Sequence, residues 1–258
     1  MDRKTKIIAT VGPSLSSEAK ISKIIDAGAN VLRINFSHGT LEDHKKVISW
    51  AKKSKKQVAI MQDIQGPKIR TGNSSKNTVL EKSKKIKLTN IETESNNDIV
   101  FINYENLLRD INVDDRVFID DGQIVLKVIE KENDILEALI LIGGELRDNQ
   151  GVAFPDSDLS VSAITNQDIE HLKFGAEHDV DYVAVSFVRN ASDINLVKEI
   201  IPKDIKIIAK IELKTALDNI DEILDIADGV MVARGDLGVQ LPLEQVPFVQ
   251  KQILDAAN

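Results

Sequence analysis

The chain has 258 residues, of which 42% are apolar and 29% charged, and its formal net charge is −8. This length suits one large α/β domain or two ordinary ones, and the composition is that of a globular rather than a disordered protein. The acidic balance argues against general affinity for nucleic acids or membranes. Because the sequence contains no cysteine, disulfides, thiolate nucleophiles and cysteine-bound metals are excluded.

The first twelve residues, MDRKTKIIATVG, begin with charges and carry only a short apolar run. They have neither the apolar centre of a signal peptide nor the length of a membrane-spanning helix. The sequence therefore predicts a cytoplasmic protein.

Short β-rich runs alternate with amphipathic helical patterns in the first and last parts of the chain. The predicted strands are residues 6–12, 30–37, 57–63, 182–188, 206–212 and 229–235. The predicted helices are residues 16–29, 40–53, 165–179, 192–201, 216–227 and 243–257. This alternation is typical of a parallel sheet covered by helices.

Between about residues 70 and 154 the pattern changes to short alternating strands with turn pairs, Asp121-Gly122 and Gly143-Gly144, and no convincing helix. We expect a small all-β domain at 70–154, inserted between residues 1–69 and 155–258 of an α/β domain. About six β/α units remain outside the insertion, whereas a closed barrel needs eight strands. The sheet is therefore either open or an incomplete barrel.

Polar side chains interrupt several strands near their carboxyl ends, although parallel strands buried on both faces are normally apolar throughout. Desolvated charges must meet each other, a metal or a ligand, so we expect a shared site at this end of the sheet. A single buried Lys–Glu pair is compatible with a structural role, but repeated breaks at equivalent strand ends favour an active site. These side chains are Arg33, Asn35, Ser37, Asp63, Lys210, Glu212 and, after the sixth strand, Asp236.

The residue types narrow the chemistry of this expected site. Glu212 and Asp236 come from consecutive strand ends, and carboxylates without neighbouring Cys or His suit Mg²⁺ or Mn²⁺ rather than zinc. Lys210 and Arg33 add cations for a phosphate or carboxylate, and the turn RGDLG (234–238) offers backbone amides to an anion. This combination predicts phosphoryl transfer, without the P-loop or protein-kinase motifs.

The sequence resembles the pyruvate kinase family in a series of stretches that follow the family's order over nearly the whole chain. The stretches are TKIIATVGPS, NVLRINFSHGT, DIQGPKIRTG, IDDG, GVAFPD, DIEHLKFGAEHDVDYVAVSFVR, IIAKIE and ADGVMVARGDLG. The resemblance implies an incomplete TIM (β/α)₈-type barrel of about six units with an inserted β lid domain. It also implies that the last two barrel units and the C-terminal domain of the family are absent.

The resemblance further implies transfer of the phosphoryl group of phosphoenolpyruvate to ADP, giving pyruvate and ATP in glycolysis, with Mg²⁺ or Mn²⁺ as cofactor. No nucleic acid or membrane partner is implied, and the family is homotetrameric. An alternative is a truncated phosphoenolpyruvate-binding fragment that is non-catalytic or is completed by a partner. A third interpretation, an aldolase-type enzyme acting on pyruvate enolate, is weakened by the β insertion and the RINFSHGT match.

The matching motifs also imply roles for individual residues. Lys210 and Arg33 would neutralise the transferred phosphoryl group, and Glu212 and Asp236 would bind Mg²⁺. The substrate site would comprise Arg33, Ser186, Lys210, Gly235 and Asp236. The nucleotide site would comprise Thr10, Pro13, Asn35, His38 and Arg70.

In potassium-dependent members of the family, K⁺ would lie among the equivalents of Asn35, Ser37, Asp63 and the Ile64 carbonyl. Those members carry Glu at the position of Lys68, and Lys there resembles the potassium-independent branch. We hypothesise that the Lys68 ammonium near Asp63 replaces K⁺, so that K⁺ is not required, although family-level K⁺ binding stays open. Departures from the family pattern, which bear on the nucleotide side, are Asp43, Gln150, Ala153 and Asp156.

Overall fold

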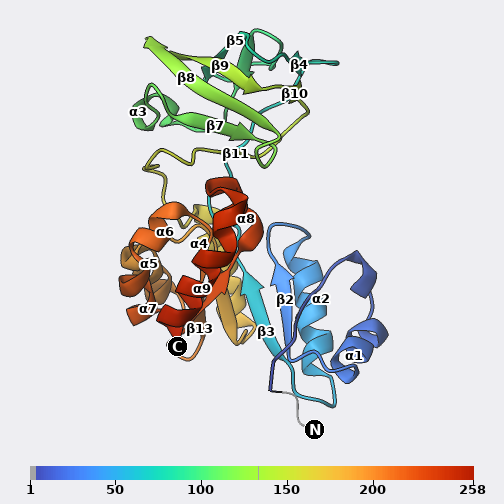
Figure 1. Ribbon diagram of the computed structural model, residues 1–258. Helices are drawn as coiled ribbons and strands as arrows, with labels where there is room; N and C mark the ends of the chain where they lie inside the picture. Colours follow the sequence, from blue (N-terminus) through green and yellow to red (C-terminus); the bar gives the residue numbers. More distant parts are fainter. Residues whose placement is uncertain (1–3, 133) are drawn as a thin grey trace.

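The computed structural model describes residues 4–132 and 134–258, which form a helix-covered parallel sheet and a separate β-rich part (Figure 1). In the parallel sheet the strand order is β1-β2-β3-β12-β13-β14, and every neighbouring pair is parallel. The strands are β1 (Ile8–Thr10), β2 (Val31–Asn35), β3 (Ala59–Asp63), β12 (Tyr182–Val185), β13 (Lys206–Ile211) and β14 (Gly229–Val232). The sheet curls into part of a barrel, which confirms the predicted fold class.

Period-two alternation divides each strand of this half barrel between two faces. On the outer face, buried apolar side chains such as Leu32, Val183 and Ile207 pack against the helices. The helices are α1 (Glu18–Asp26), α2 (Leu41–Lys52), α4 (Asn166–Glu177), α5 (Ala191–Ile200), α6 (Lys214–Asp218), α7 (Ile220–Ile226), α8 (Arg234–Gln240) and α9 (Val246–Ala257). Two short 3₁₀ helices, η1 (Pro13–Leu15) and η2 (Leu243–Gln245), complete this part.

Two details of the helices differ from the sequence prediction. The helix expected at 216–227 is divided at Asn219 into α6 and α7, and residues 234–238, expected as a turn, begin the helix α8. The glycines of RGDLG weaken the helical pattern in the sequence. Packing overrides this local weakness, since Leu237 of α8 is completely buried.

Capping boxes begin two of the helices. In α2 the Thr40 side chain accepts from the Asp43 amide while Asp43 accepts from the Thr40 amide, and Thr165 and Asp168 do the same in α4. Asp168 has a further task, because its other carboxylate oxygen accepts from the amide of Gly66 at 3.2 Å. The start of α4 is thereby attached to the loop that follows β3.

The β-rich part lies between β3 and β12 in the sequence, yet these two strands are neighbours in the parallel sheet. Its main sheet has the order β11-β7-β8-β9-β5-β6, and β10 pairs with β4 in a small second sheet. The strands are β4 (Val79–Leu80), β5 (Lys85–Thr89), β6 (Ile99–Phe101), β7 (Arg116–Ile119), β8 (Ile124–Glu132), β9 (Ile135–Ile142), β10 (Gly144–Glu145) and β11 (Val152–Ala153). This part has its own apolar core, which includes Leu88, Leu126 and Ile140.

Both predicted turn pairs have a physical basis in the β-rich part. Asp121 and Gly122 have φ of 54° and 86° in the turn between β7 and β8. A Cβ on Gly143 would lie 2.1 Å from the Leu80 carbonyl oxygen, so only glycine fits there. The prediction of no helix was wrong, because the single turn α3 (Leu107–Asp110) buries Leu107 in the core.

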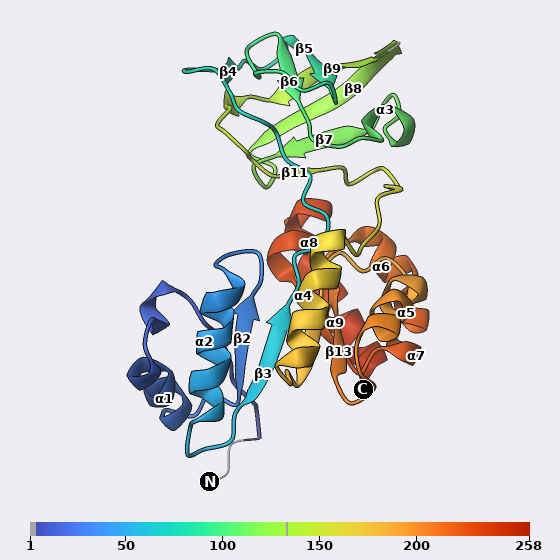
Figure 2. The same ribbon diagram turned by 180° about the vertical axis from the view of Figure 1, so that it is seen from behind.

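The β-rich part stands over the carboxyl ends of β2 and β3, as both views show (Figures 1 and 2). The parallel sheet has two open edges within residues 4–132 and 134–258, because there β1 pairs only with β2 and β14 only with β13. In the described part of the chain, no helix is long and apolar enough to cross a membrane.

Candidate active site

The charged side chains predicted from the strand ends meet around Asp63 on the inner face of the half barrel. Its carboxylate receives Arg33 Nε at 2.6 Å and Arg33 Nη2 at 2.5 Å on one oxygen. The other oxygen lies 3.2 Å from Lys210 Nζ. Asp63 is only 1% exposed, so its charge is balanced by these two cations rather than by water.

Lys210 donates to three acceptors. Its ammonium lies 2.7 Å from Ser186 Oγ, 2.8 Å from Glu212 Oε1 and 3.2 Å from Asp63 Oδ1. Burial alone would lower the pKa of Lys210, but the carboxylates of Glu212 and Asp63 outweigh it and raise that pKa. The amine is therefore a fixed positive charge, suited to stabilising negative charge on a substrate.

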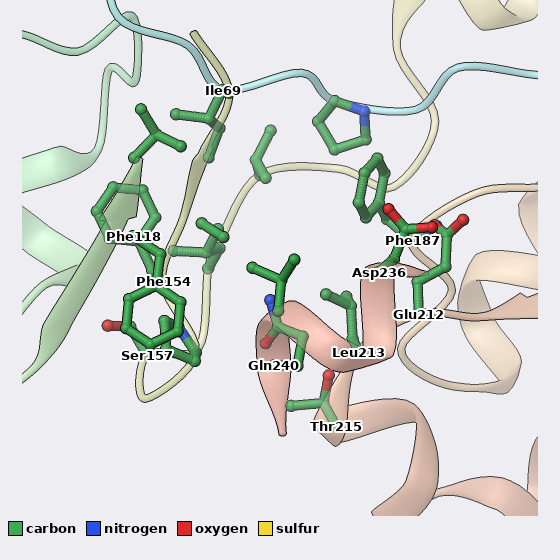
Figure 3. Close-up of a pocket in the computed structure, with 18 of the residues that line it drawn as sticks. Ile69, Phe118, Phe154, Ser157, Phe187, Glu212, Leu213, Thr215, Asp236 and Gln240 are labelled. Carbon is green, nitrogen blue, oxygen red and sulfur yellow. The ribbon is translucent and has the colours of Figure 1, made fainter. Parts of the chain in front are cut away.

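Glu212, the other acid that contacts Lys210, is buried at 2% exposure. Burial raises its pKa; Lys210 opposes the shift and the negative charge of Asp236 adds to it. The carboxylates of Glu212 and Asp236 lie close together at one end of a pocket (Figure 3). A cation between them would relieve their repulsion.

This pocket is a cleft of about 280 Å³ between the β-rich part and the half barrel. Apolar side chains such as Phe118 and Phe154 form the wall on the β-rich side, opposite Leu213 of the half barrel (Figure 3). The charged side chains that line it are Lys68, Arg70, Asp121, Asp158, Arg189, Glu212, Lys214 and Asp236.

The carboxylates of Glu212 and Asp236 suit a divalent ion that also binds oxygen atoms of a substrate. Among residues 4–132 and 134–258, no group of three or more His, Cys, Asp or Glu side chains could hold a metal ion. Mg²⁺ commonly binds one or two carboxylates together with water and substrate oxygens, rather than a complete protein cage. Glu212 and Asp236 provide such a pair.

The residues predicted for K⁺ already have partners within the protein. Asn35 Oδ1 accepts from the Ser37 amide at 2.9 Å, and the Ile64 carbonyl accepts from Ser186 Oγ at 2.7 Å. In the described part of the chain, Lys68 forms no ion pair with Asp63. Lys68 lines the cleft, where burial and the charges of Arg70 and Lys210 lower its pKa.

The predicted nucleotide residues are distributed over the β1–β2 end of the sheet and the entrance to the β-rich part. Thr10 Oγ1 accepts from Arg33 Nη1 at 3.0 Å, which connects it to the Asp63 cluster. Arg70 lines the cleft and donates to the Asn149 carbonyl at 2.9 Å. Pro13 begins η1 after β1, and His38 follows β2 on an exposed loop.

Three of the four departures from the family pattern have structural partners. Asp156 receives Arg116 Nε at 2.7 Å and Nη2 at 2.8 Å, and Asp43 completes the capping box of α2. Gln150 is buried, and its Oε1 accepts from the Arg147 amide. Ala153 lies in β11 and lines the cleft.

One contact was absent from the sequence prediction. The backbone amide of Phe187 donates to Glu212 Oε2 at 2.8 Å. Phe187 has φ of 54°, an unusual conformation for a bulky side chain, and nothing in the sequence signals it. Gly66 leaves the space that the Phe187 ring occupies, because a Cβ at Gly66 would lie 2.9 Å from Phe187 Cδ2.

The parallel half barrel with cations and carboxylates at its strand ends defines the class of β/α-barrel proteins whose site lies at the carboxyl face of the barrel. A family model described as "Pyruvate kinase, barrel domain" matches residues 2–258. The chain belongs to the pyruvate kinase family.

Similar curated proteins carry the same family name. The chain is 44% identical to a pyruvate kinase of Thermotoga maritima over 98% of its own length and 56% of the relative. It is 42% identical to a Staphylococcus aureus pyruvate kinase and 40% identical to a Staphylococcus epidermidis one, in each case over 99% of this chain and 46% of the relative. The chain thus spans about half the length of the curated relatives it matches.

Proposed function

We propose that this chain supplies the phosphoryl-transfer site of a pyruvate kinase, which moves the phosphoryl group of phosphoenolpyruvate to ADP and yields pyruvate and ATP. The observation that carries the proposal is the Lys210 ammonium, held between Asp63 and Glu212 beside the cleft that Asp236 also lines. In a member of this family, that arrangement supports phosphoryl transfer by positioning and charge neutralisation.

The proposed roles follow from the charge of each group. Lys210 and Arg33 attract the phosphoryl group and stabilise negative charge as it moves. Glu212 and Asp236 would hold Mg²⁺ or Mn²⁺, which would supply Lewis-acid chemistry to the substrate. The backbone amides of Gly235 and Asp236, at the start of α8, donate hydrogen bonds to the substrate carboxylate.

For the nucleotide we propose a site that extends from the β1–β2 end of the parallel sheet to the entrance of the β-rich part. Its residues are Thr10, Pro13, Asn35, His38 and Arg70. Arg70 supports this role because it lies on the chain segment leading into the β-rich part and lines the cleft. We further propose that the β-rich part acts as a lid over the cleft.

We propose that K⁺ is not required. The supporting observations are that Asn35, Asp63 and Ile64 already direct their oxygens to protein donors, and that the Lys68 side chain lies near enough to Lys210 for their charges to interact. We also propose a cytoplasmic location, with no nucleic acid or membrane partner. Assembly of the whole protein into homotetramers belongs to the same proposal.

A second candidate is a phosphoenolpyruvate-binding piece that is non-catalytic or is completed by a partner. The two open edges of the parallel sheet favour it, because strands β1 and β14 leave their outer backbone groups unpaired by other strands among the described residues. Intact Lys210, Glu212 and Asp236 favour the enzyme.

A lactate dehydrogenase-coupled assay on the 258-residue chain, with phosphoenolpyruvate, ADP and Mg²⁺, separates the two candidates. We expect turnover that Lys210→Met lowers by at least about a hundredfold, since the fixed positive charge is lost. Calorimetric binding of phosphoenolpyruvate with Mg²⁺ but no turnover would support the second candidate. If the chain neither binds phosphoenolpyruvate nor shows turnover, both candidates are contradicted.

A further inference from the structure

Two consecutive residues after β12 each contact one member of the Lys210–Glu212 pair. Ser186 Oγ lies 2.7 Å from Lys210 Nζ, and the Phe187 amide lies 2.8 Å from Glu212 Oε2. β12 pairs with β13, the strand that carries Lys210, so both contacts cross between neighbouring strand ends. The cation and the carboxylate are therefore held from the same short segment.

The Ser186 hydroxyl can be oriented in only one way. The Lys210 ammonium is a donor without lone pairs, so Ser186 Oγ must accept from it. The serine proton then goes to the Ile64 carbonyl, 2.7 Å away. Since the Ile64 amide donates to the Ala184 carbonyl at 3.0 Å, Ser186 connects the ends of β3, β12 and β13.

The Phe187 amide depends on a strained backbone. Phe187 has φ of 54°, and such a conformation of a bulky residue persists only where its surroundings impose it. The ring packs against Gly66, where an added Cβ would lie 2.9 Å from Phe187 Cδ2. The glycine thus makes room for the ring, and the ring in turn keeps the amide in place.

We propose that Ser186 and Phe187 are positioning residues: the Ser186 hydroxyl fixes the Lys210 ammonium, and the Phe187 amide fixes the Glu212 carboxylate toward the cleft. The inference rests on the proposed function. Ser186 is 4% exposed, and both hydrogen bonds of its hydroxyl are internal. In this proposal Ser186 acts through Lys210, whereas the resemblance to the family implies a direct substrate contact.

Partners of this kind set the orientation of a ligand group, and removing one typically costs about 10–100-fold in metal affinity or activity. Ser186 and Phe187 are uncharged, so replacing either one by another neutral residue leaves the charge of the site unchanged. Their loss should therefore disorder Lys210 or Glu212 without removing either group.

The Ser186 contact can be tested without turnover, from the ¹H–¹⁵N signal of the Lys210 ammonium. A buried ammonium with three acceptors exchanges its protons slowly, so we expect an observable cross-peak that disappears in Lys210→Arg. It should broaden beyond detection in Ser186→Ala and return in Ser186→Thr, which keeps the hydroxyl. Ser186→Cys, with a weak acceptor, should also broaden it and serves if the alanine variant does not fold.

Ser95→Ala is the matched control. Ser95 is completely buried in the β-rich part, and its hydroxyl oxygen accepts from the Phe101 amide at 3.0 Å. The Ser95→Ala variant loses a comparable hydrogen bond at a position far from Lys210 in the sequence. The Lys210 ammonium cross-peak should therefore persist in it. A cross-peak that survives in Ser186→Ala, or is missing from the parent chain, would overturn the role of Ser186.

The Phe187 contact can be tested with Mn²⁺ alone, measured by electron paramagnetic resonance. We expect Phe187→Ala, which removes the ring that holds the amide, to weaken Mn²⁺ binding about tenfold. Phe187→Leu keeps an apolar side chain beside Gly66 and should restore most of the affinity. Equal affinity in the parent and Phe187→Ala, or no Mn²⁺ binding by the parent, would overturn this role.

These results are independent of the coupled assay. A chain without turnover whose Lys210 signal still responds to Ser186→Ala would refute the proposed function and keep the positioning role. Suppose instead that the chain shows turnover, that Ser186→Ala leaves the Lys210 cross-peak unchanged, and that Phe187→Ala leaves the Mn²⁺ affinity unchanged. That result would refute the positioning role and keep the proposed function.

Discussion

At the scale of single residues, two acids of the site, Asp63 and Glu212, combine deep burial with a cationic partner. Asp63 and Glu212 are at most 2% exposed, and each has a cationic partner within 3.2 Å. Removing one partner of a buried ion pair leaves an uncompensated charge, which is far more costly than exchanging surface charges. Substitutions at Lys210 must therefore be read for stability as well as for turnover.

Lys68 offers a direct test of the monovalent-ion hypothesis. Lys68→Glu replaces a fixed cation with an anion, so we expect turnover of this variant to rise with added K⁺, while the parent responds equally to Na⁺ and K⁺. The rate is measured in the coupled assay across a series of the two chloride salts at constant ionic strength.

Lys214→Glu is the control for that experiment, because Lys214 lines the same cleft and undergoes the same change of charge. Its K⁺ response should remain that of the parent. If Lys68→Glu is no more K⁺-dependent than the parent, the hypothesis fails.

At the scale of elements, the two capping boxes differ in what surrounds them. Asp43 of α2 is exposed, whereas Asp168 of α4 is 1% exposed and also accepts from the Gly66 amide. We expect Asp43→Ala to lower the unfolding free energy only slightly, because it removes the solvent-exposed half of a capping box. Asp168→Ala should cost about 1–3 kcal/mol more, because it leaves the buried Gly66 amide without its acceptor.

Urea unfolding followed by circular dichroism measures both variants. Equal losses would show that the Gly66 contact contributes nothing to stability. Thr165→Ala removes the cap but keeps Asp168, so its loss should resemble that of Asp43→Ala rather than that of Asp168→Ala.

How far the sequence predicts these elements depends on what each pattern encodes. Alternation along 30–37 and 206–212 predicts that Arg33 and Asn35 share one face, and Lys210 and Glu212 another, because side chains alternate along any strand. Alternation does not say which strands become neighbours. Asp63 contacts both Arg33 and Lys210 because β3 lies between β2, which carries Arg33, and β12, which is followed by β13 with Lys210. The pairing of β3 with β12 joins segments that are far apart in the chain.

Backbone conformation was the other source of error. The two glycines of RGDLG predict a turn, yet burial of Leu237 stabilises the helix α8 there. The left-handed φ of Phe187 has no local signal at all, since its cause is the space beside Gly66. Such features arise from tertiary packing, which a local pattern does not contain.

At the scale of the whole molecule, the structure contains two separate apolar cores, one beneath the helices of the half barrel and one within the β-rich part. We expect Leu126→Ala, in the β-rich core, to cost about 2–5 kcal/mol locally. Hydrogen exchange should accelerate in β8 and β9, while the urea midpoint of Trp50 fluorescence, which reports on the half barrel, changes little.

Leu32→Ala is the matched substitution in the other core, since both leucines are completely buried. It should shift the Trp50 midpoint and leave exchange in β8 and β9 nearly unchanged. A Trp50 midpoint that moves equally in both variants would show that the two cores unfold together.

The open edges of the parallel sheet affect how the purified chain behaves in solution. Near them lie exposed apolar side chains, with Ile8 of β1 48% exposed and Phe248 of α9 76% exposed. Unpaired strand edges and exposed apolar side chains together favour the addition of strands from other molecules, so the conditions in which the chain is handled affect what an assay measures. Slow aggregation could then be mistaken for absence of activity. Working with dilute protein, storing it cold and measuring light scattering before each assay would prevent this mistake.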